Sequence, residues 1–126
     1  MGLADTRARQ KEARQVTISE FQRQIERTYL ERDRRRGLDA DFRWFVEEVG
    51  ELAEALRRSE RGALANEFAD VFAWLSTMAS IAGVELEEAV RKYAGGCPKC
   101  GEAPCGCPEG TAGDRESGIG DGLDHR

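Results

Sequence analysis

Residues 45–54 read FVEEVGELAE, a stretch in which apolar and small residues recur at the spacing of a helix. The same stretch holds four carboxylates, those of Glu47, Glu48, Glu51 and Glu54. Like charges three or four residues apart on a helix cost a few tenths of a kcal/mol per pair, so such a cluster is either solvated or in contact with a cation. The sequence on either side of it helps to decide between these two.

Helical periodicity extends outward from this stretch, from about Thr17 to Tyr93. Four helices are predicted, between residues 19 and 37, from 39 or 41 to 58, from 62 to 82 and from 85 to 93. Glycines punctuate the turns, and no proline precedes Pro98. Because no segment alternates as a strand does, the sequence predicts an all-α bundle of about four helices.

Composition places the chain among soluble globular proteins. Its 126 residues suffice for one domain, with 34% charged and 40% hydrophobic residues. A net charge of −5 disfavours a nucleic-acid coat protein, so nucleic acid is not an expected partner. The first twenty residues lack the apolar run of a signal peptide, and the longest apolar run, 71–84, is too short to span a bilayer. We therefore expect a cytoplasmic location and no membrane contact.

The composition changes at about Gly95, where glycine, proline and cysteine become frequent. This change predicts three parts: a helical domain at 17–94, a cysteine-rich appendage at 95–108 and a tail at 109–126 that stays disordered because it has few apolar residues.

The second predicted helix carries one apolar stripe about 120° wide, which we interpret as its core face. Its members are Phe42, Phe45, Val46, Val49, Leu52, Ala53 and Leu56. The four glutamates lie off this stripe. Glu48 and Glu51 flank one edge beside Trp44, which makes them the better metal ligands. Glu47 and Glu54 either point to water or pair with arginines such as Arg58.

The third predicted helix is apolar or small almost all round, yet it carries Glu67 and Asp70 at i, i+3. No Lys or Arg occurs between Arg61 and Arg91. A partly buried carboxylate without a partner costs several kcal/mol, so the balancing charge comes from elsewhere in the fold or from a bound ion. The hypothesis is an all-oxygen site for Mg2+ or Mn2+ with four ligands. These are Glu48, Glu51, Glu67 and Asp70.

The pattern Glu47-Glu48-x-x-Glu51, followed about fifteen residues later by Glu67-x-x-Asp70, resembles the EExxE and ExxD signature of the MazG-like all-α nucleoside triphosphate pyrophosphohydrolases. The resemblance covers roughly residues 17–92. It implies a metal-dependent hydrolase that splits a nucleoside triphosphate between its α and β phosphates. It also implies a homodimer or homotetramer whose bundle includes helices from more than one subunit.

The resemblance assigns roles to the acids. It implies that Glu48, Glu51, Glu67 and Asp70 bind Mg2+ (or Mn2+). A spare carboxylate can then orient or deprotonate the attacking water, and either Glu51 or Glu47 can fill that catalytic role.

Substrate contacts are predicted at three further residues. Lys92 is a candidate phosphate ligand, the alternative being a solvated helix end, and after it the chain departs from the family, many of whose members continue with a Lys and an Asn. Trp44 and Trp74 are candidates for stacking on the base, the alternative being a core or subunit interface. Arg32 and the run of arginines at 34–36 are lower-ranked candidates to face the nucleotide or a neighbouring subunit, the alternative being a solvated cluster.

The segment CPKCGEAPCGC holds all four cysteines, Cys97, Cys100, Cys105 and Cys107. Their concentration favours a structural Zn2+ site over disulfide or redox pairing and over no metal at all.

Two functions are predicted from these motifs. The first is Mg2+-dependent hydrolysis of a nucleoside or deoxynucleoside triphosphate for nucleotide-pool housekeeping, with the nucleotide left open. The alternative is a non-catalytic module that binds a protein or nucleic acid through the cysteine segment.

Overall fold

The computed structural model describes residues 15–109 of the 126. It contains the helices α2 (Ile18–Arg36), α3 (Leu38–Arg58), α4 (Arg61–Ile81) and α5 (Leu86–Ala89), followed by the 3₁₀ helix η1 (Val90–Tyr93). None of these described residues forms a strand. The all-α prediction is confirmed, and the helix bounds lie within a few residues of those predicted. The last predicted helix is part α and part 3₁₀.

The chain divides into two compact units, Met1–Glu88 and Ala89–Arg126. The predicted domain limits at 94/95 and 108/109 stay predictions. Apart from Glu109, the tail predicted at 109–126 lies outside the described residues.

Local chemistry explains the helix ends. Thr17 caps α2, since its Oγ1 accepts a hydrogen bond of 3.0 Å from the backbone N–H of Glu20. Gly37 separates α2 from α3 with φ 99°, and Gly83 follows α4 with φ 77°. Both angles favour glycine, which has no Cβ to clash with the backbone.

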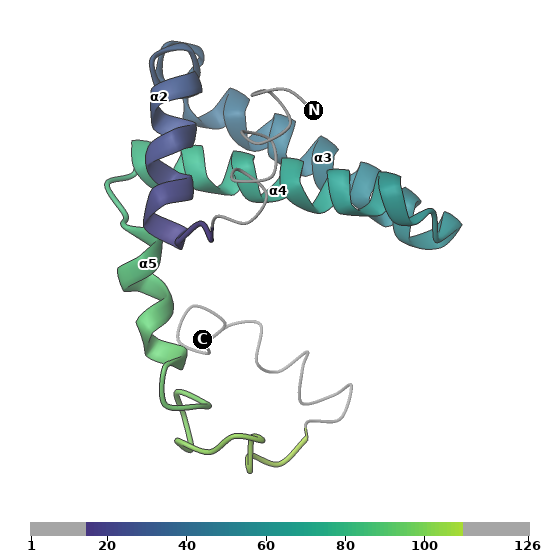
Figure 1. Cartoon of the computed structure of the whole chain (residues 1–126). Helices are drawn as coiled ribbons and strands as arrows, with labels where there is room; N and C mark the ends of the chain where they lie inside the picture. The colour runs from purple at the N-terminus through teal and green to yellow at the C-terminus, as the bar shows by residue number, and fades with distance from the viewer. Residues whose placement is uncertain (1–14, 110–126) are drawn as a thin grey trace, which may run out of the picture. The chain divides into compact units, whose positions relative to one another are not determined.

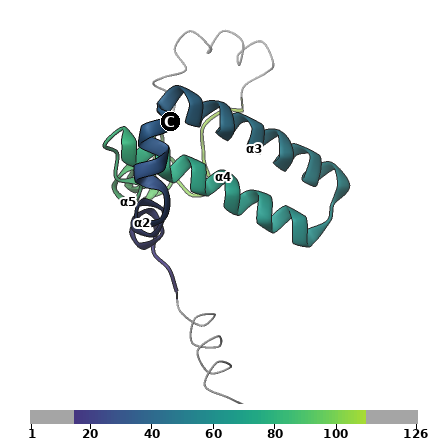
Figure 2. The ribbon, with the colours of Figure 1, turned by 90° about the horizontal axis from the view of Figure 1, so that it is seen from above.

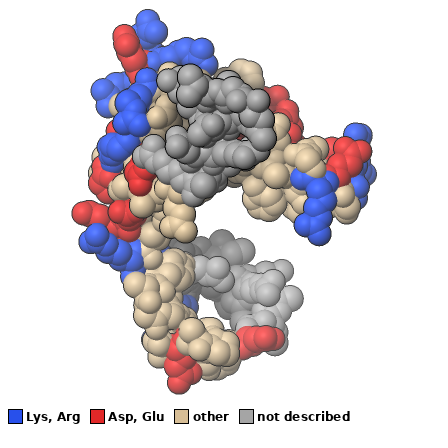
Figure 3. Space-filling model, viewed as in Figure 1, with Lys and Arg blue, Asp and Glu red and all other residues tan. Residues whose placement is uncertain are grey.

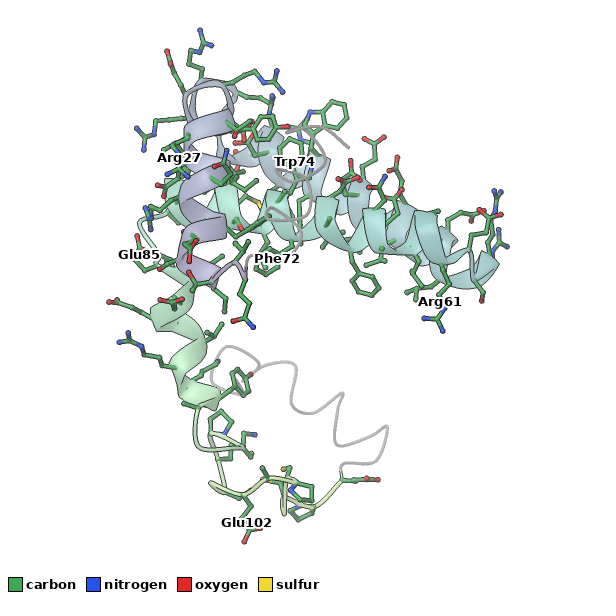
Figure 4. The ribbon with its side chains drawn as sticks, in the orientation of Figure 1. Arg27, Arg61, Phe72, Trp74, Glu85 and Glu102 are labelled. Carbon is green, nitrogen blue, oxygen red and sulfur yellow. The ribbon has the colours of Figure 1, made fainter. Side chains whose placement is uncertain are left out.

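Helices α3 and α4 form an antiparallel hairpin and run side by side in both ribbon views (Figures 1 and 2). The helix α2 crosses this hairpin and packs mainly on α4 (Figure 1). Arg61 marks the far end of the hairpin, which α2 does not reach (Figure 4).

A polar seam fixes α2 on α4. Gln22 has no exposed surface, and its Nε2 donates to Ser80 Oγ at 3.0 Å and to the Val84 carbonyl at 2.9 Å. Its Oε1 accepts a hydrogen bond of 2.9 Å from the backbone N–H of Leu86. Because a buried amide needs such partners, Gln22 holds the turn after α4 in one conformation.

The predicted core stripe of α3 is wrong for the single chain. Five of its seven members are exposed: Ala53 and four large residues, Phe42, Val46, Val49 and Leu56, which are exposed by 40–54%. The side of α3 that is most buried carries Asp41, Glu48 and Ala55, and its centre lies roughly 100° around the helix from the centre of the stripe, at about 100° per residue. In the described part of the chain, Ile25 and Ala55, at 8% and 7% exposed, are the only buried apolar residues. The pairing of the hairpin therefore turns the acids inward and leaves a broad apolar face uncovered.

Among the described helices, no single one is long and apolar enough to cross a membrane. One pair of helical segments has the length and composition of a membrane span only when the two are taken together: Arg61–Ile81 and Leu86–Tyr93, which meet at a bend of 98°.

Candidate functional site

Three carboxylates meet where α3 faces α4. Glu48 comes from α3, and Glu67 and Asp70 come from successive turns of α4. One oxygen of each lies within 4.8 Å of the others, close enough to hold one metal ion. The i, i+3 spacing puts the two α4 acids on one face of that helix, and the antiparallel pairing sets Glu48 opposite them.

Two oxygens of this cluster lack hydrogen-bond partners. Glu48 Oε2 and Glu67 Oε2 are both buried and accept no hydrogen bond from any residue that the structure describes. Burial, together with the charge of Glu51, raises the pKa of Glu48 to about 7. The same two causes raise the pKa of Glu67. A set of carboxylate oxygens crowded together without donors fits a hard divalent cation such as Mg2+ or Mn2+, which supplies the missing positive charge.

The other two acids of the EExxE motif differ in position. Glu51 lies outside the group of three, but its charge raises the pKa of both Glu48 and Glu67, so it is their neighbour. It also lines a pocket of about 210 Å³ with Glu67 and Arg58. Glu47 is exposed on α3 and lines neither this pocket nor the one described next.

A second pocket, of about 250 Å³, opens beside Glu48 and Asp70. The helices α2 and α4 supply its remaining lining residues, which are Ile25, Tyr29, Arg32, Asp33, Ala73, Trp74 and Thr77. Arg32 belongs to a group of arginines on α2 that also includes Arg27, Arg34 and Arg35, and Figure 3 shows basic side chains over that end of the helix. The acids thus adjoin a pocket with aromatic and basic walls.

The two tryptophans form one aromatic wall. Their rings are nearly parallel, at 7°, with centroids 6.4 Å apart. Trp74 and Phe72 lie on opposite sides of α4 (Figure 4), which matches their separation of two residues on a helix. Trp74 lines the 250 Å³ pocket, whereas Trp44 is exposed beside it.

Behind Trp74 lies a buried ion-pair network that the sequence did not reveal. Arg36 Nη1 donates to Asp33 Oδ1 and to Asp41 Oδ1, each at 2.9 Å. Thr77 Oγ1 donates to Asp33 Oδ2 at 2.8 Å. The guanidinium carbon of Arg36 also lies 5.4 Å from the ring centroid of Trp74. The only signal in the sequence was the i, i+3 spacing of Asp33 and Arg36, which is common on solvated helices.

Two effects in this network shift the pKa of Asp41 in opposite directions. Burial raises the pKa of Asp41, and the hydrogen bond from Arg36 acts in the opposite direction. The hydrogen bond to Asp41 in turn raises the pKa of Arg36. Asp41 Oδ2 is buried without a partner, so Arg36 is the main compensation for two buried carboxylates.

The second unit holds the remaining predicted residues. Lys92 is exposed, with Nζ 5.2 Å from the ring centroid of Tyr93. The four cysteines are free thiols, and their Sγ atoms all lie within 4.8 Å of one another, so they form a second group able to hold a metal ion.

Fold and site together define an all-α protein with a cluster of three carboxylates, set between facing helices, that could hold a metal ion. The chain matches the family model of the MazG nucleotide pyrophosphohydrolase domain over residues 38–100. It belongs to that family, as the EExxE and ExxD motifs predicted. No curated protein matches the chain in a sequence comparison.

Proposed function

We propose that the protein hydrolyses a nucleoside or deoxynucleoside triphosphate to the monophosphate and pyrophosphate, with Mg2+ or Mn2+ as its cofactor. One observation carries this proposal: Glu48 and Glu67, from two helices, each bury an oxygen without a hydrogen-bond partner among the described residues, in a cluster completed by Asp70. Such a cluster is costly without a cation, and a triphosphate brings one with it.

In this reaction Glu48, Glu67 and Asp70, with Glu51 beside them, hold the cation. When bound, the ion neutralises phosphate charge and lowers the pKa of a coordinated water. Glu51 and Glu47 are the two candidates to orient or deprotonate the attacking water. The position of Glu51, next to the three acids yet outside their group, supports Glu51 over the exposed Glu47.

The 250 Å³ pocket is the proposed site for part of the nucleotide. It is smaller than the roughly 300–1,000 Å³ of whole-ligand pockets, so it suits the nucleoside end while the phosphates reach the acids. Trp74, extended by Trp44, offers a face for the base, and Arg32 offers a positive charge. Lys92 remains a proposed phosphate contact. The nucleotide itself is to be identified by assay.

We also propose that the chain acts as a homodimer or homotetramer. The uncovered face carries large apolar residues that are 37–54% exposed, and Phe42 of α3 lines one apolar pocket with Leu75 of α4. Large exposed apolar patches mark interaction surfaces. The members of this face are Phe42, Val46, Val49 and Leu56 on α3 and Phe68, Phe72 and Leu75 on α4. Size-exclusion chromatography with light scattering measures the assembly, and a monomer at micromolar concentration contradicts the proposal.

A second candidate function follows from the cysteine group, for which we propose Zn2+. A closed thiolate site is structural, and in this alternative the protein is a non-catalytic module that binds a partner through the cysteine segment.

We propose the cytoplasm as the location of the protein, because reduced thiols and nucleotide substrates both occur there.

The deciding experiment measures pyrophosphate release from a panel of ribo- and deoxyribonucleoside triphosphates with Mg2+ or Mn2+. The native chain is compared with Glu67→Gln and Asp70→Asn, and with Glu88→Gln as a matched control, since Glu88 is an exposed acid outside the cluster. We expect the first two variants to lose about 100-fold or more in rate and the control to keep its rate. A folded, metal-loaded native chain without turnover on any nucleotide favours the binding module.

A further inference from the structure

We propose that Cys97, Cys100, Cys105 and Cys107 bind one Zn2+ in a tetrahedral site, and that the conformation of residues 96–107 depends on this ion. The proposal is independent of the hydrolase activity, because it concerns a separate unit of the chain and a different class of metal ligand.

Two of the six sulfur–sulfur distances match the edge of a zinc tetrahedron, and all six are within 4.8 Å. A regular ZnS4 centre with Zn–S bonds of about 2.3 Å has S···S edges of about 3.8 Å. Cys97 Sγ lies 3.8 Å from Cys107 Sγ, and Cys100 Sγ lies 3.9 Å from Cys105 Sγ. Disulfide sulfurs are about 2.05 Å apart, so the four free thiols are arranged around a point and not bonded in pairs.

Backbone amides point at the sulfurs, as thiolate ligands require. The N–H of Gly106 donates to Cys100 Sγ at 3.3 Å, and that of Cys107 donates to Cys105 Sγ at 3.4 Å. Hydrogen bonds of this kind stabilise the negative charge that four thiolates leave around a divalent ion.

A tight turn over residues 97–102 brings the first two cysteines together. The N–H of Gly101 donates to the Cys97 carbonyl at 2.7 Å, and the N–H of Cys97 donates to the Glu102 carbonyl at 2.9 Å. Gly101 has φ 77°, and at Gly96, with φ 115°, a Cβ would lie 2.8 Å from the backbone of Glu102. Glycine is thus required on both sides of the first cysteine pair.

This segment has almost no apolar core of its own. Between residues 94 and 109, only Gly96, Cys97 and Cys107 are even half-buried. Apolar burial of this size does not offset the conformational entropy of the ordered residues, which amounts to about 1–2 kcal/mol per residue for the backbone alone. Metal binding supplies folding free energy in sites that no core supports, so we infer that Zn2+ orders the segment.

The two groups of ligands differ in the metal that they select. Four soft sulfur ligands select Zn2+, whereas the carboxylates of Glu48, Glu67 and Asp70 select a hard ion such as Mg2+. A variant of one group should therefore leave the metal of the other group in place. This separation is the basis of the test.

The test uses the full chain, purified under reducing conditions with excess Mg2+. Metal content is measured by mass spectrometry for the native chain, Cys100→Ser, Cys105→Ser and the matched control Glu67→Gln. We expect one Zn2+ per chain in the native protein and in Glu67→Gln, and at least a tenfold loss of retained zinc in both cysteine variants after dialysis against a weak chelator. Co2+ in place of Zn2+ should give the visible absorption of a tetrahedral thiolate site.

Amide NMR of the same samples reads the folding step. Removing the metal should collapse the resonances of Gly101, Gly106 and Cys107 toward random-coil positions, while those of α3 and α4 stay dispersed. The proposal is overturned if the native chain retains no Zn2+, if Glu67→Gln loses zinc as the cysteine variants do, or if those three amides are unchanged by metal removal. None of these readings requires turnover, so failure of the hydrolase proposal leaves this test intact.

Discussion

Replacing Arg36 by methionine tests the buried ion-pair network between α2, α3 and α4. The substitution keeps a long side chain but removes the guanidinium that donates to Asp33 and Asp41. Asp33 keeps its hydrogen bond from Thr77, whereas Asp41, which has no exposed surface, keeps no donor among the described residues. The variant therefore leaves a buried carboxylate without a hydrogen-bond donor.

The expected cost follows from burial. Removing one partner of a buried ion pair typically costs 3–5 kcal/mol, because the remaining charge stays desolvated. The side chain of Arg36 is 26% exposed, and those of Asp33 and Asp41 are 6% and 0% exposed, so water screens the pair partly and the lower end applies. We expect a loss of about 3 kcal/mol, or a fall in Tm of roughly 10–20 °C for a domain of this size.

The cost should depend on pH. Burial already raises the pKa of Asp41, and loss of Arg36 raises it further. A carboxyl group whose pKa is raised in the folded state is neutral at low pH and destabilises the fold once it ionises. Arg36→Met should therefore lose less stability at about pH 5 than at about pH 8. Adding Asp41→Asn should restore part of the loss at the higher pH.

Urea denaturation followed by far-UV circular dichroism measures these differences, at one fixed protein concentration because assembly would contribute to stability. Arg35→Met is the control, since Arg35 is the exposed neighbour on α2, and it should stay within about 0.5 kcal/mol of the native chain. If Arg36→Met is as stable as Arg35→Met, with the same m-value, the network does not stabilise the fold and the reasoning is refuted.

Three further predictions concern the metal centre, the pocket and the uncovered face. The pKa of Glu48 is raised from 4.5 to about 7, so without divalent metal the stability of the fold should fall as the pH rises through this range. Added Mg2+ should then raise Tm more at pH 8 than at pH 5, and equal shifts at the two pH values contradict this. Trp74→Leu should raise KM roughly tenfold or more with a smaller change in kcat, because base stacking contributes about 1–3 kcal/mol to binding. A change in kcat alone argues against stacking on Trp74. Phe42→Glu should reduce the oligomer measured by light scattering, whereas Glu88→Gln should not.

Much of the fold was predictable from local signals. Helix bounds follow from periodicity, from the Thr17 cap and from glycines such as Gly37, whose φ of 99° suits no other residue well. Two of the predicted metal ligands, Glu67 and Asp70, share a face by their i, i+3 spacing alone. That they meet Glu48 was a hypothesis from the charge balance of the two helices, which the family resemblance also implied, and the structure brings these three carboxylates together.

The face that α3 buries was not predictable from its apolar stripe. The stripe containing Phe42 is exposed in the single chain, and the side with Asp41, Glu48 and Ala55 packs inward. Periodicity reports which residues avoid water, but it does not tell whether the helix hairpin or another surface covers them.

The sequence by itself thus determined the helices, the two acid pairs, the cysteine cluster and the family, because each depends on spacing within one short segment. Only the tertiary structure decided which carboxylates converge, that Arg36 bridges Asp33 and Asp41, and that Trp74 lines a pocket next to the acids. These features join residues on different helices, and their distances depend on how the helices cross, which no local pattern encodes.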